Sequence, residues 1–193
     1  MIPLKELEEL AKKSVSKKRF KHIINVCEQA ESLGKHYHED IYQCRLAALL
    51  HDMTKELKFE SQLQMILKSD IMASDIILKS TPLYHAVTGY IYAKDELGIT
   101  DINVLNAVRY HTTGRAGMSK LEKIIYIADA ISMDRKYKEV ARFRELSFVD
   151  LDICLLEIIR HTIRYLVKDN CLIPADTLNC YNELIVNLGE IRC

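Results

Sequence analysis

Apolar residues recur every three to four positions along almost the whole chain, as they do on the buried face of a helix. One such series is Phe20, Ile23, Ile24, Cys27 and Ala30, and another is Leu151, Cys154, Leu155, Ile158 and Ile159. Sustained alternation of apolar and polar residues, which would indicate strands, does not occur in the sequence. The pattern therefore predicts an all-α protein.

The periodic segments predict ten helices, with turn residues between them. We expect helices near residues 4–13, 17–33, 39–52, 56–67, 70–79, 83–96, 102–111, 119–132, 150–168 and 175–188. Gly34, Gly98 and Gly189 each follow an apolar run, so each is predicted to end a helix. The charged segment 132–147 is expected to be irregular or solvent-facing.

The length of the chain indicates a single domain, and its charge balance bears on the kind of ligand it can bind. A chain of 193 residues can bury a sizeable core as one domain, and we expect a single domain over residues 1–193. Its motif-bearing core would cover about 17–137, and packing helices would follow over about 148–190. Lys plus Arg equals Asp plus Glu at 27 each, so the formal net charge is zero. This balance argues against nucleic-acid partners, because an anionic ligand would have to be held by local charge.

The sequence also favours a cytoplasmic protein with no membrane partner. Its first ten residues lack the basic and apolar parts of a secretion signal, and no stretch approaches the roughly 20 apolar residues that span a bilayer. The six cysteines, the last of them Cys193, form no C-x-x-C pair, so we expect mostly buried thiols in a reducing compartment. The oligomeric state stays open, with a homodimer as one option.

His51 and Asp52 stand together at the end of the apolar segment 41–50. An imidazole beside a carboxylate is costly to bury unless a cation neutralises the acid and uses the nitrogen lone pair. A divalent metal does both. His22 and Asp129 lie on apolar helical stripes, so both are expected to point into the core. For Asp129 the main alternative to a metal is an internal salt bridge.

Two further histidines are candidate ligands. Small residues continue the helical face of His85, which lets neighbouring helices approach closely. His111 ends its predicted helix, so its ring can reach sideways from the helix end. A single histidine in a helical pattern is more often a hydrogen-bonded residue than a ligand. His36, His38 and His161 are interpreted in that way and left out of the site.

The order of these residues, H…HD…D, resembles that of HD-domain phosphohydrolases. More narrowly, several segments are similar to those of YqeK-type bacterial HD proteins: RFKHIINV, LAALLHDMTK, HAVTGYIYAKDELGI, VRYHTTGRAGM and LEKIIYIAD. The similarity runs from about residue 17 to about residue 137. It implies a helical bundle of the HD type and symmetrical hydrolysis of diadenosine tetraphosphate to two ADP, by a water activated on a dinuclear metal centre.

The resemblance also implies a ligand set. His22, His51, Asp52 and Asp129 would hold one metal, and His85 and His111 would hold the other, with Asp52 bridging the two. The implied metals are two divalent ions, usually described as iron, although histidine and aspartate ligands also suit manganese, cobalt, nickel and zinc. One departure is visible, because the family tends to carry an acidic residue where Ser132 stands here.

Other polar residues near the ligands are expected to bind the substrate. These predicted substrate-binding residues are Lys55, Thr113, Gly114 and Arg135. Asp52 and Lys55 are also predicted to be catalytic. A solvated position at a helix end explains Lys55 equally well, and a surface ion pair with Asp134 or Glu139 explains Arg135 equally well.

Three alternatives stay open. A nucleotidase or cyclic-nucleotide phosphodiesterase would keep the metals and change the substrate, and a mixed-valent iron pair could instead serve an oxygenase. A non-catalytic nucleotide sensor would bind the nucleotide without turnover. The complete ligand set argues against a sensor, which has no need of a centre that activates water.

Overall fold

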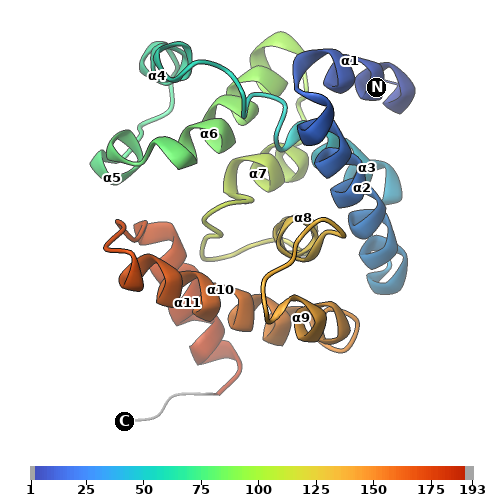
Figure 1. Ribbon diagram of the computed structural model, residues 1–193, viewed down its shortest axis with the longest axis vertical. Coiled ribbons are helices and arrows are strands. Elements are labelled where there is room, and N and C mark those ends of the chain that lie inside the picture. Colours follow the sequence, from blue (N-terminus) through green and yellow to red (C-terminus); the bar gives the residue numbers. More distant parts are fainter. Residues whose placement is uncertain (1–2, 190–193) are drawn as a thin grey trace.

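The computed structural model describes residues 3–189, and over that range the chain forms helices joined by short loops (Figure 1). The helices are α1 (Leu4–Ser14), α2 (Lys17–Tyr37), α3 (Ile41–Leu50), α4 (Phe59–Lys68), α5 (Asp75–Lys79), α6 (Tyr84–Ile91), α7 (Ile102–Tyr110), α8 (Lys120–Ile131), α9 (Val140–Leu146), α10 (Leu151–Lys168) and α11 (Ala175–Asn187). A 3-10 turn, η1 (Thr81–Leu83), precedes α6, and a π-helical turn, η2 (Tyr92–Glu96), follows it. The described residues contain no strand, so the all-α prediction is confirmed.

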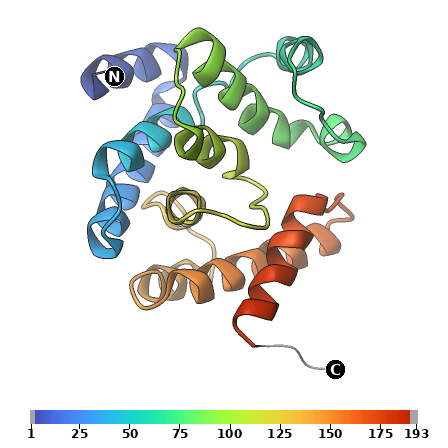
Figure 2. The same cartoon turned by 180° about the vertical axis from the view of Figure 1, so that it is seen from behind.

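Helix α8 lies at the centre of the molecule. It packs against α2, α3 and α7, and on its other side against α9 and α10 (Figures 1 and 2). Most of its side chains are buried, among them Leu121, Ile124, Ile125 and Ile127. Ser119 begins the helix with a capping box, since its side chain accepts from the backbone N–H of Glu122 and that glutamate accepts from the backbone N–H of Ser119. Asp129 is thereby set on a rigid, central element.

Helix α4 packs away from this centre, against α6, and α5 packs against the 3-10 turn η1 that precedes α6 (Figure 1). They share with α6 a second, smaller cluster of buried apolar residues, made of Ile66, Ile77, Tyr84, Val87 and Ile91. Helix α6 also packs against α7. It therefore connects the peripheral cluster to the helices around α8.

One predicted helix end is wrong. Gly34 lies inside α2, which continues to Tyr37 before His38 adopts a left-handed conformation with φ of 55°. A Cβ atom on Gly34 would stand 2.8 Å from Sγ of Cys44, so glycine serves the close approach of α2 and α3 rather than helix termination. Gly98 and Gly189 do follow helical segments with positive φ, as predicted.

The segment predicted to be irregular is helical in its second half. Helix α9 occupies Val140–Leu146 and buries Val140 and Phe143. Helix α9 was not predicted because its seven residues are rich in charge and contain too few apolar positions to show a helical pattern in the sequence. The predicted helix 70–79 is shorter than expected, because it begins only after Ser74, whose side chain accepts from the backbone N–H of Ile77.

Four of the five described cysteines are buried thiols, and Cys171 is exposed. Cys193 and residue 190, the end of the predicted packing region, lie outside the described residues. Over residues 3–189, no helix combines the length and apolar character that crossing a membrane requires.

Candidate metal centre

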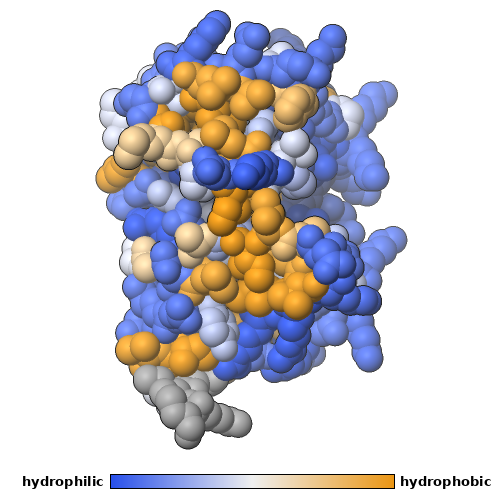
Figure 3. All heavy atoms as spheres, turned by 90° about the vertical axis from the view of Figure 1, so that its left-hand side faces the viewer, coloured by the Kyte–Doolittle hydropathy of each residue, from blue (hydrophilic) through white to orange (hydrophobic). Residues whose placement is uncertain are grey.

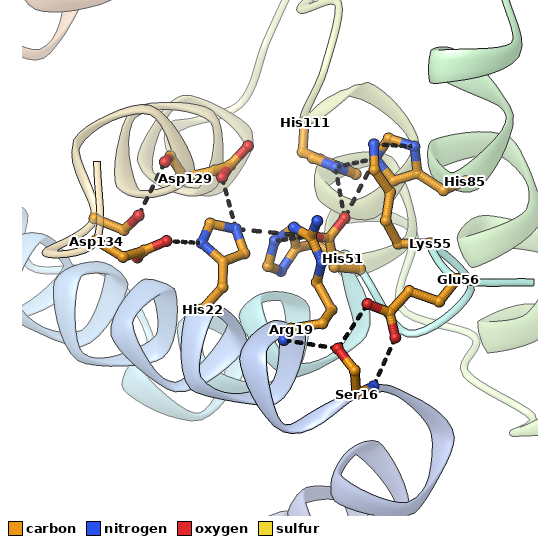
Figure 4. Close-up of polar contacts among 12 residues, drawn as sticks. Ser16, Arg19, His22, His51, Lys55, Glu56, His85, His111, Asp129 and Asp134 are labelled. Carbon is orange, nitrogen blue, oxygen red and sulfur yellow. Dashed lines mark hydrogen bonds and ion pairs between the residues drawn. The ribbon is translucent and has the colours of Figure 1, made fainter. Parts of the chain in front are cut away.

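The six predicted ligands meet at one place between the helices (Figure 4). They come from α2 (His22), from the turn after α3 (His51 and Asp52), from α6 (His85), from the end of α7 (His111) and from α8 (Asp129). All are buried except Asp129, whose side chain keeps 17% of its exposure. The structure therefore brings together residues that lie up to 107 positions apart in the sequence.

The carboxylate of Asp52 stands between two groups of imidazoles. Its Oδ2 lies 3.6 Å from Nε2 of His22 and 3.5 Å from Nε2 of His51. Its Oδ1 lies 3.3 Å from Nε2 of His85 and 3.9 Å from Nε2 of His111. We call the group with His22, His51 and Asp129 the Oδ2 side, and the group with His85 and His111 the Oδ1 side.

Close helix packing makes this meeting possible. A Cβ atom on Gly89 of α6 would lie 3.1 Å from Cγ1 of Val108 on α7 and 3.6 Å from the carbonyl oxygen of His51. Only a small residue at this position lets α6 approach both segments. The short side chains of His85 and His111 can then reach each other, and their Nε2 atoms lie 3.1 Å apart.

The donor atoms fit a divalent metal. Nε2 of His22 and Nε2 of His51 are buried and have no hydrogen-bond partner, although Oδ1 of Asp129 lies 3.0 Å from the His22 atom. Buried lone pairs that face one another are costly unless a cation lies between them. Among the described residues, two sets of three ligand atoms lie within 4.8 Å of one another: His22, His51 and Asp129, and His51, Asp52 and His111. Imidazole and carboxylate donors of this kind suit divalent transition metals.

Backbone carbonyl groups orient two of the rings. Nδ1 of His51 lies 2.7 Å from the carbonyl oxygen of Ala48, and Nδ1 of His111 lies 2.7 Å from that of Val108. A proton on each Nδ1 completes these hydrogen bonds and leaves the Nε2 lone pair directed at the centre. Both histidines follow the last turn of a helix, where carbonyl groups lack helical partners.

Two residues of the site were not predicted as members. Oδ2 of Asp134 lies 2.9 Å from Nδ1 of His22, and Nη1 of Arg19 donates to Oδ2 of Asp52 at 2.8 Å. Arg19 stands three positions before His22 on α2, so a shared helical face could have revealed it. Asp134 follows α8 in a non-helical turn, where no periodic pattern assigns a direction to its side chain.

The predicted substrate-binding cations contact the ligands. Nζ of Lys55 lies 3.0 Å from Nδ1 of His85, so this lysine is not simply solvated. Nε of Arg135 donates to the carbonyl oxygen of Asp129 at 3.0 Å, and its guanidinium also pairs with the Asp129 carboxylate. The internal salt bridge considered for Asp129 is thus present. It leaves Nε2 of His22 without a hydrogen bond.

Burial and neighbouring charges set the ionisation of the cluster. Burial opposes a charge on Asp52, yet His51 outweighs it and holds the pKa of Asp52 well below its usual range. Burial together with His111 lowers the pKa of His85 well below its usual value, and burial together with His51 lowers the pKa of His111 to about 4. Burial opposes protonation of His51 too, but Asp52 raises its pKa. Neutral imidazoles and an ionised carboxylate are the forms that bind metals.

A cavity of about 410 Å³ opens onto the cluster. Its walls include the charged and ligand residues Arg19, Asp52, Lys55, His85, His111, Asp129 and Arg135, and also Thr112, Tyr126, Tyr137, His161 and Thr162. His161, left out as a ligand, stacks on Tyr137 with 5.1 Å between ring centroids. Thr113 and Gly114 are not among the residues that line this cavity, since Gly114 packs against Cys180 of α11. Their contact with substrate stays a prediction.

The geometry can be compared with known proteins. Residues 19–134 match the model of the HD domain. The chain is 36% identical over 92% of its length, and 95% of the relative's, to the symmetrical bis(5'-nucleosyl)-tetraphosphatase of Halalkalibacterium halodurans. It is 32% identical to the Bacillus subtilis protein of the same name, over 90% of this chain and 93% of that one.

A solved structure agrees with the fold. A crystal structure from Clostridium acetobutylicum, described as a predicted HD superfamily hydrolase involved in NAD metabolism, superposes with a TM-score of 0.93 and 34% sequence identity. The match covers 97% of this chain and 99% of that one. The ligand-bearing helices therefore lie within a fold already observed by crystallography.

Proposed function

Because the chain belongs to the HD-domain family and, within it, to the symmetrical bis(5'-nucleosyl)-tetraphosphatases, we propose that it hydrolyses diadenosine tetraphosphate to two ADP. One water is consumed: its oxygen bonds to one of the two central phosphorus atoms, and the bond between the two central phosphates breaks. The observation that carries this proposal is the convergence of four histidines on the two oxygens of Asp52, in a chain so similar to these relatives.

Two divalent ions would be held at the two sides of Asp52. His22, His51 and Asp129 would bind the ion on the Oδ2 side, and His85 and His111 the ion on the Oδ1 side, with Asp52 bridging. When bound, such ions lower the pKa of water and stabilise charge that builds on a phosphoryl group. Two ions carry four positive charges, and Asp52 and Asp129 offset two of them. The remaining charge favours a polyphosphate ligand.

The chain's own cations complete the phosphate site. Lys55, Arg19 and Arg135 line the cavity beside the ligands. Lys55 would donate a hydrogen bond to a phosphate oxygen, and either arginine could bind two oxygens at once through its planar guanidinium. Asp52 would hold the two metal ions at a fixed separation. Its predicted catalytic role is therefore to position those ions for action on the central phosphates.

Finer features belong to the same proposal. We propose iron as the metal, as the resemblance implies, with manganese, cobalt, nickel or zinc as substitutes. The unpaired state of the described cysteines supports a reducing compartment such as the cytoplasm. The absence of a nucleic-acid partner and a homodimeric assembly stay predictions.

The test is a digest of diadenosine tetraphosphate by the metal-loaded protein and by His51→Ala, with nucleotides separated by chromatography and metal content measured. We expect ADP as the sole nucleotide product, with activity and metal lost together in the variant. Equal amounts of AMP and ATP would contradict symmetrical cleavage. Inorganic phosphate released from mononucleotides at a similar rate would favour a nucleotidase, and binding without turnover a sensor.

A further inference from the structure

We propose that Arg144 of α9 is a positioning residue, which holds the turn 132–135 and through it the partners of His22 and Asp129. Arg144 is not among the residues that line the metal cavity, so it would act only through other side chains. The inference rests on the metal centre of the proposed function, because His22 and Asp129 are two of the proposed ligands.

Helix α9 contributes little to the apolar surface of the molecule. The face on which α5 and the α10–α11 connection approach each other carries a broad run of apolar surface, whereas α9 lies toward the other side (Figures 1 and 3). The buried apolar residues of α9 are Val140 and Phe143. Its distinctive feature is polar, because Arg144 faces the end of α8.

Arg144 donates three hydrogen bonds to backbone carbonyl groups around the end of α8. Its Nε donates to the carbonyl oxygen of Ile131 at 2.8 Å. Its Nη2 donates to the carbonyl oxygens of Ser132, at 2.7 Å, and of Arg135, at 3.2 Å. The last carbonyl groups of a helix lack helical partners, and a planar guanidinium can satisfy several acceptors at once. Arg144 thus joins the end of α8 to the far side of the turn 132–135.

The turn itself has little support from packing. The backbone N–H of Arg135 closes it by donating to the carbonyl oxygen of Ser132 at 2.9 Å. Ser132 is fully buried, but Met133 in the middle of the turn is 66% exposed. A segment with few buried apolar contacts is easily displaced unless hydrogen bonds hold it. The bonds from Arg144 therefore help to fix its orientation.

This turn carries two residues that contact proposed metal ligands. Oδ2 of Asp134 lies 2.9 Å from Nδ1 of His22, and Oδ1 of Asp134 accepts from Nδ2 of Asn25 at 2.9 Å (Figure 4). Arg135 pairs with the carboxylate of Asp129 and lines the cavity. A displaced turn would move both side chains at once. Partners of this kind orient a ligating histidine, so their displacement weakens metal binding.

Charge and geometry predict opposite effects when Arg144 is removed. A cation near a metal centre repels the metal, so on charge alone its loss should raise metal affinity. On the positioning role, its loss frees the turn, weakens the contact between Asp134 and His22, and lowers metal affinity. The direction of the change therefore separates the two roles.

The experiment measures the affinity of Mn²⁺ for wild-type protein, Arg144→Gln and Arg142→Gln by chelator competition. Arg142 is the matched control, because it lies on the same helix and pairs with Glu157 through a side chain that is 64% exposed. We expect Arg144→Gln to bind Mn²⁺ about tenfold more weakly, at the lower end of the range for outer-shell partners. The control should match wild type. Equal or higher affinity in Arg144→Gln would overturn the proposal.

A double variant tests the route of the effect. Because Arg144 would act through the contact of Asp134 with His22, Arg144→Gln/Asp134→Asn should bind Mn²⁺ no more weakly than Asp134→Asn alone. A general loss of structure would instead add to the effect of Asp134→Asn. Losses that multiply in the double variant would therefore overturn the positioning role.

Arg144→Lys keeps the charge but replaces the planar fork with one ammonium group, and it is the milder test if Arg144→Gln does not fold. We expect Mn²⁺ affinity to fall about threefold, because only part of the hydrogen bonding is kept. Unchanged affinity in Arg144→Lys would overturn the proposal.

The failure of this inference and the failure of the proposed function give different results. Wild-type protein that binds Mn²⁺ without cleaving diadenosine tetraphosphate would contradict the hydrolase proposal alone, because the affinities of the variants need no turnover. Wild-type protein that binds no Mn²⁺ would contradict the metal centre on which both proposals rest.

Discussion

The two sides of Asp52 differ in how their ligands are supported. On the Oδ2 side, Nδ1 of His22 faces the Asp134 carboxylate, and Asp129 adds a carboxylate of its own. On the Oδ1 side, the ammonium of Lys55, which can only donate hydrogen bonds, lies beside the ring of His85, 3.0 Å from Nδ1 and 3.3 Å from Nε2. An acceptor behind a ligating histidine fixes its tautomer and raises its basicity, whereas a cation close to the ring nitrogens opposes a second cation there.

This difference indicates that the two sides of the centre serve different purposes, one in holding metal and the other in meeting the substrate. We expect the Oδ2 side to hold a metal more tightly, because it combines two imidazoles, a carboxylate of its own and an acceptor behind His22. Arg19 and Arg135, which pair with Asp52 and Asp129 on this side, would have to release those carboxylates to the metal. His85 and His111 of the Oδ1 side line the cavity together with Lys55, whereas His22 and His51 do not, so the Oδ1 side is placed to meet the substrate. We expect the metal on the Oδ1 side to bind more weakly.

The largest effect is expected from Asp52→Asn, which removes the charge shared by both sides. An amide cannot bridge two cations with two equivalent oxygens, so both metals should be lost. Turnover should fall by more than the roughly 100-fold that loss of an outer-shell partner can cause. Asp70→Asn, on the surface beside Lys94, is the control and should behave like wild type. An Asp52→Asn protein that retains both metals would contradict the shared role.

The next largest effect is a difference in metal content between variants of the two sides. His51 belongs to both close sets of ligand atoms, so His51→Ala should lose both metals. His85→Ala should lose one and keep the ion on the Oδ2 side. Metal per chain, measured after removal of free ions, distinguishes the two variants. Loss of both metals in His85→Ala, with one metal kept in His51→Ala, would show that the Oδ1 side binds its metal more tightly.

Asp134→Asn tests the support behind His22. The substitution keeps the size of the side chain but weakens the acceptor for the Nδ1 proton. Metal affinity should fall about 10- to 100-fold, as for other outer-shell partners of ligating histidines. A chelator competition assay measures this change. Unchanged metal affinity would show that Asp134 does not support His22 as a ligand.

Lys55→Gln tests the opposite kind of neighbour. It removes a cation beside His85, so metal affinity should stay the same or rise, while KM for diadenosine tetraphosphate increases several-fold because a phosphate contact is lost. Steady-state kinetics at saturating metal separate the two effects. A fall in metal content with unchanged KM would assign Lys55 to metal binding instead of substrate binding.

The smallest effect concerns pH and the metal-free protein. The pKa of His111 is about 4 in the folded chain, below the ordinary histidine value. As pH falls below that ordinary value, the unfolded chain takes up a proton that folded His111 resists, so stability decreases. Between about pH 7 and about pH 5 the loss from this group is about 2 kcal/mol. Urea unfolding of chelator-treated protein should show a smaller loss for His111→Gln, and equal losses in both proteins would contradict the low pKa.

The sequence predicted which polar side chains meet in the core better than it predicted the residues that support them. His22, His85 and Asp129 could be assigned because helical periodicity fixes the direction of side chains within a helix. The contact between Asp134 and His22 could not be predicted, because it depends on a turn that joins positions 112 residues apart. Helix α9 escaped detection for a related reason, since only its tertiary contacts bury Val140 and Phe143. Gly34 was misjudged because a glycine at a close helix contact and one at a helix end look alike in sequence.

The most direct test of the account is anomalous diffraction from crystals of the metal-loaded protein, recorded at the absorption edge of the metal. The account predicts two peaks, one beside each oxygen of Asp52, with the stronger peak on the Oδ2 side next to His22, His51 and Asp129. A single peak, or peaks away from Asp52, would contradict a dinuclear centre organised by this carboxylate.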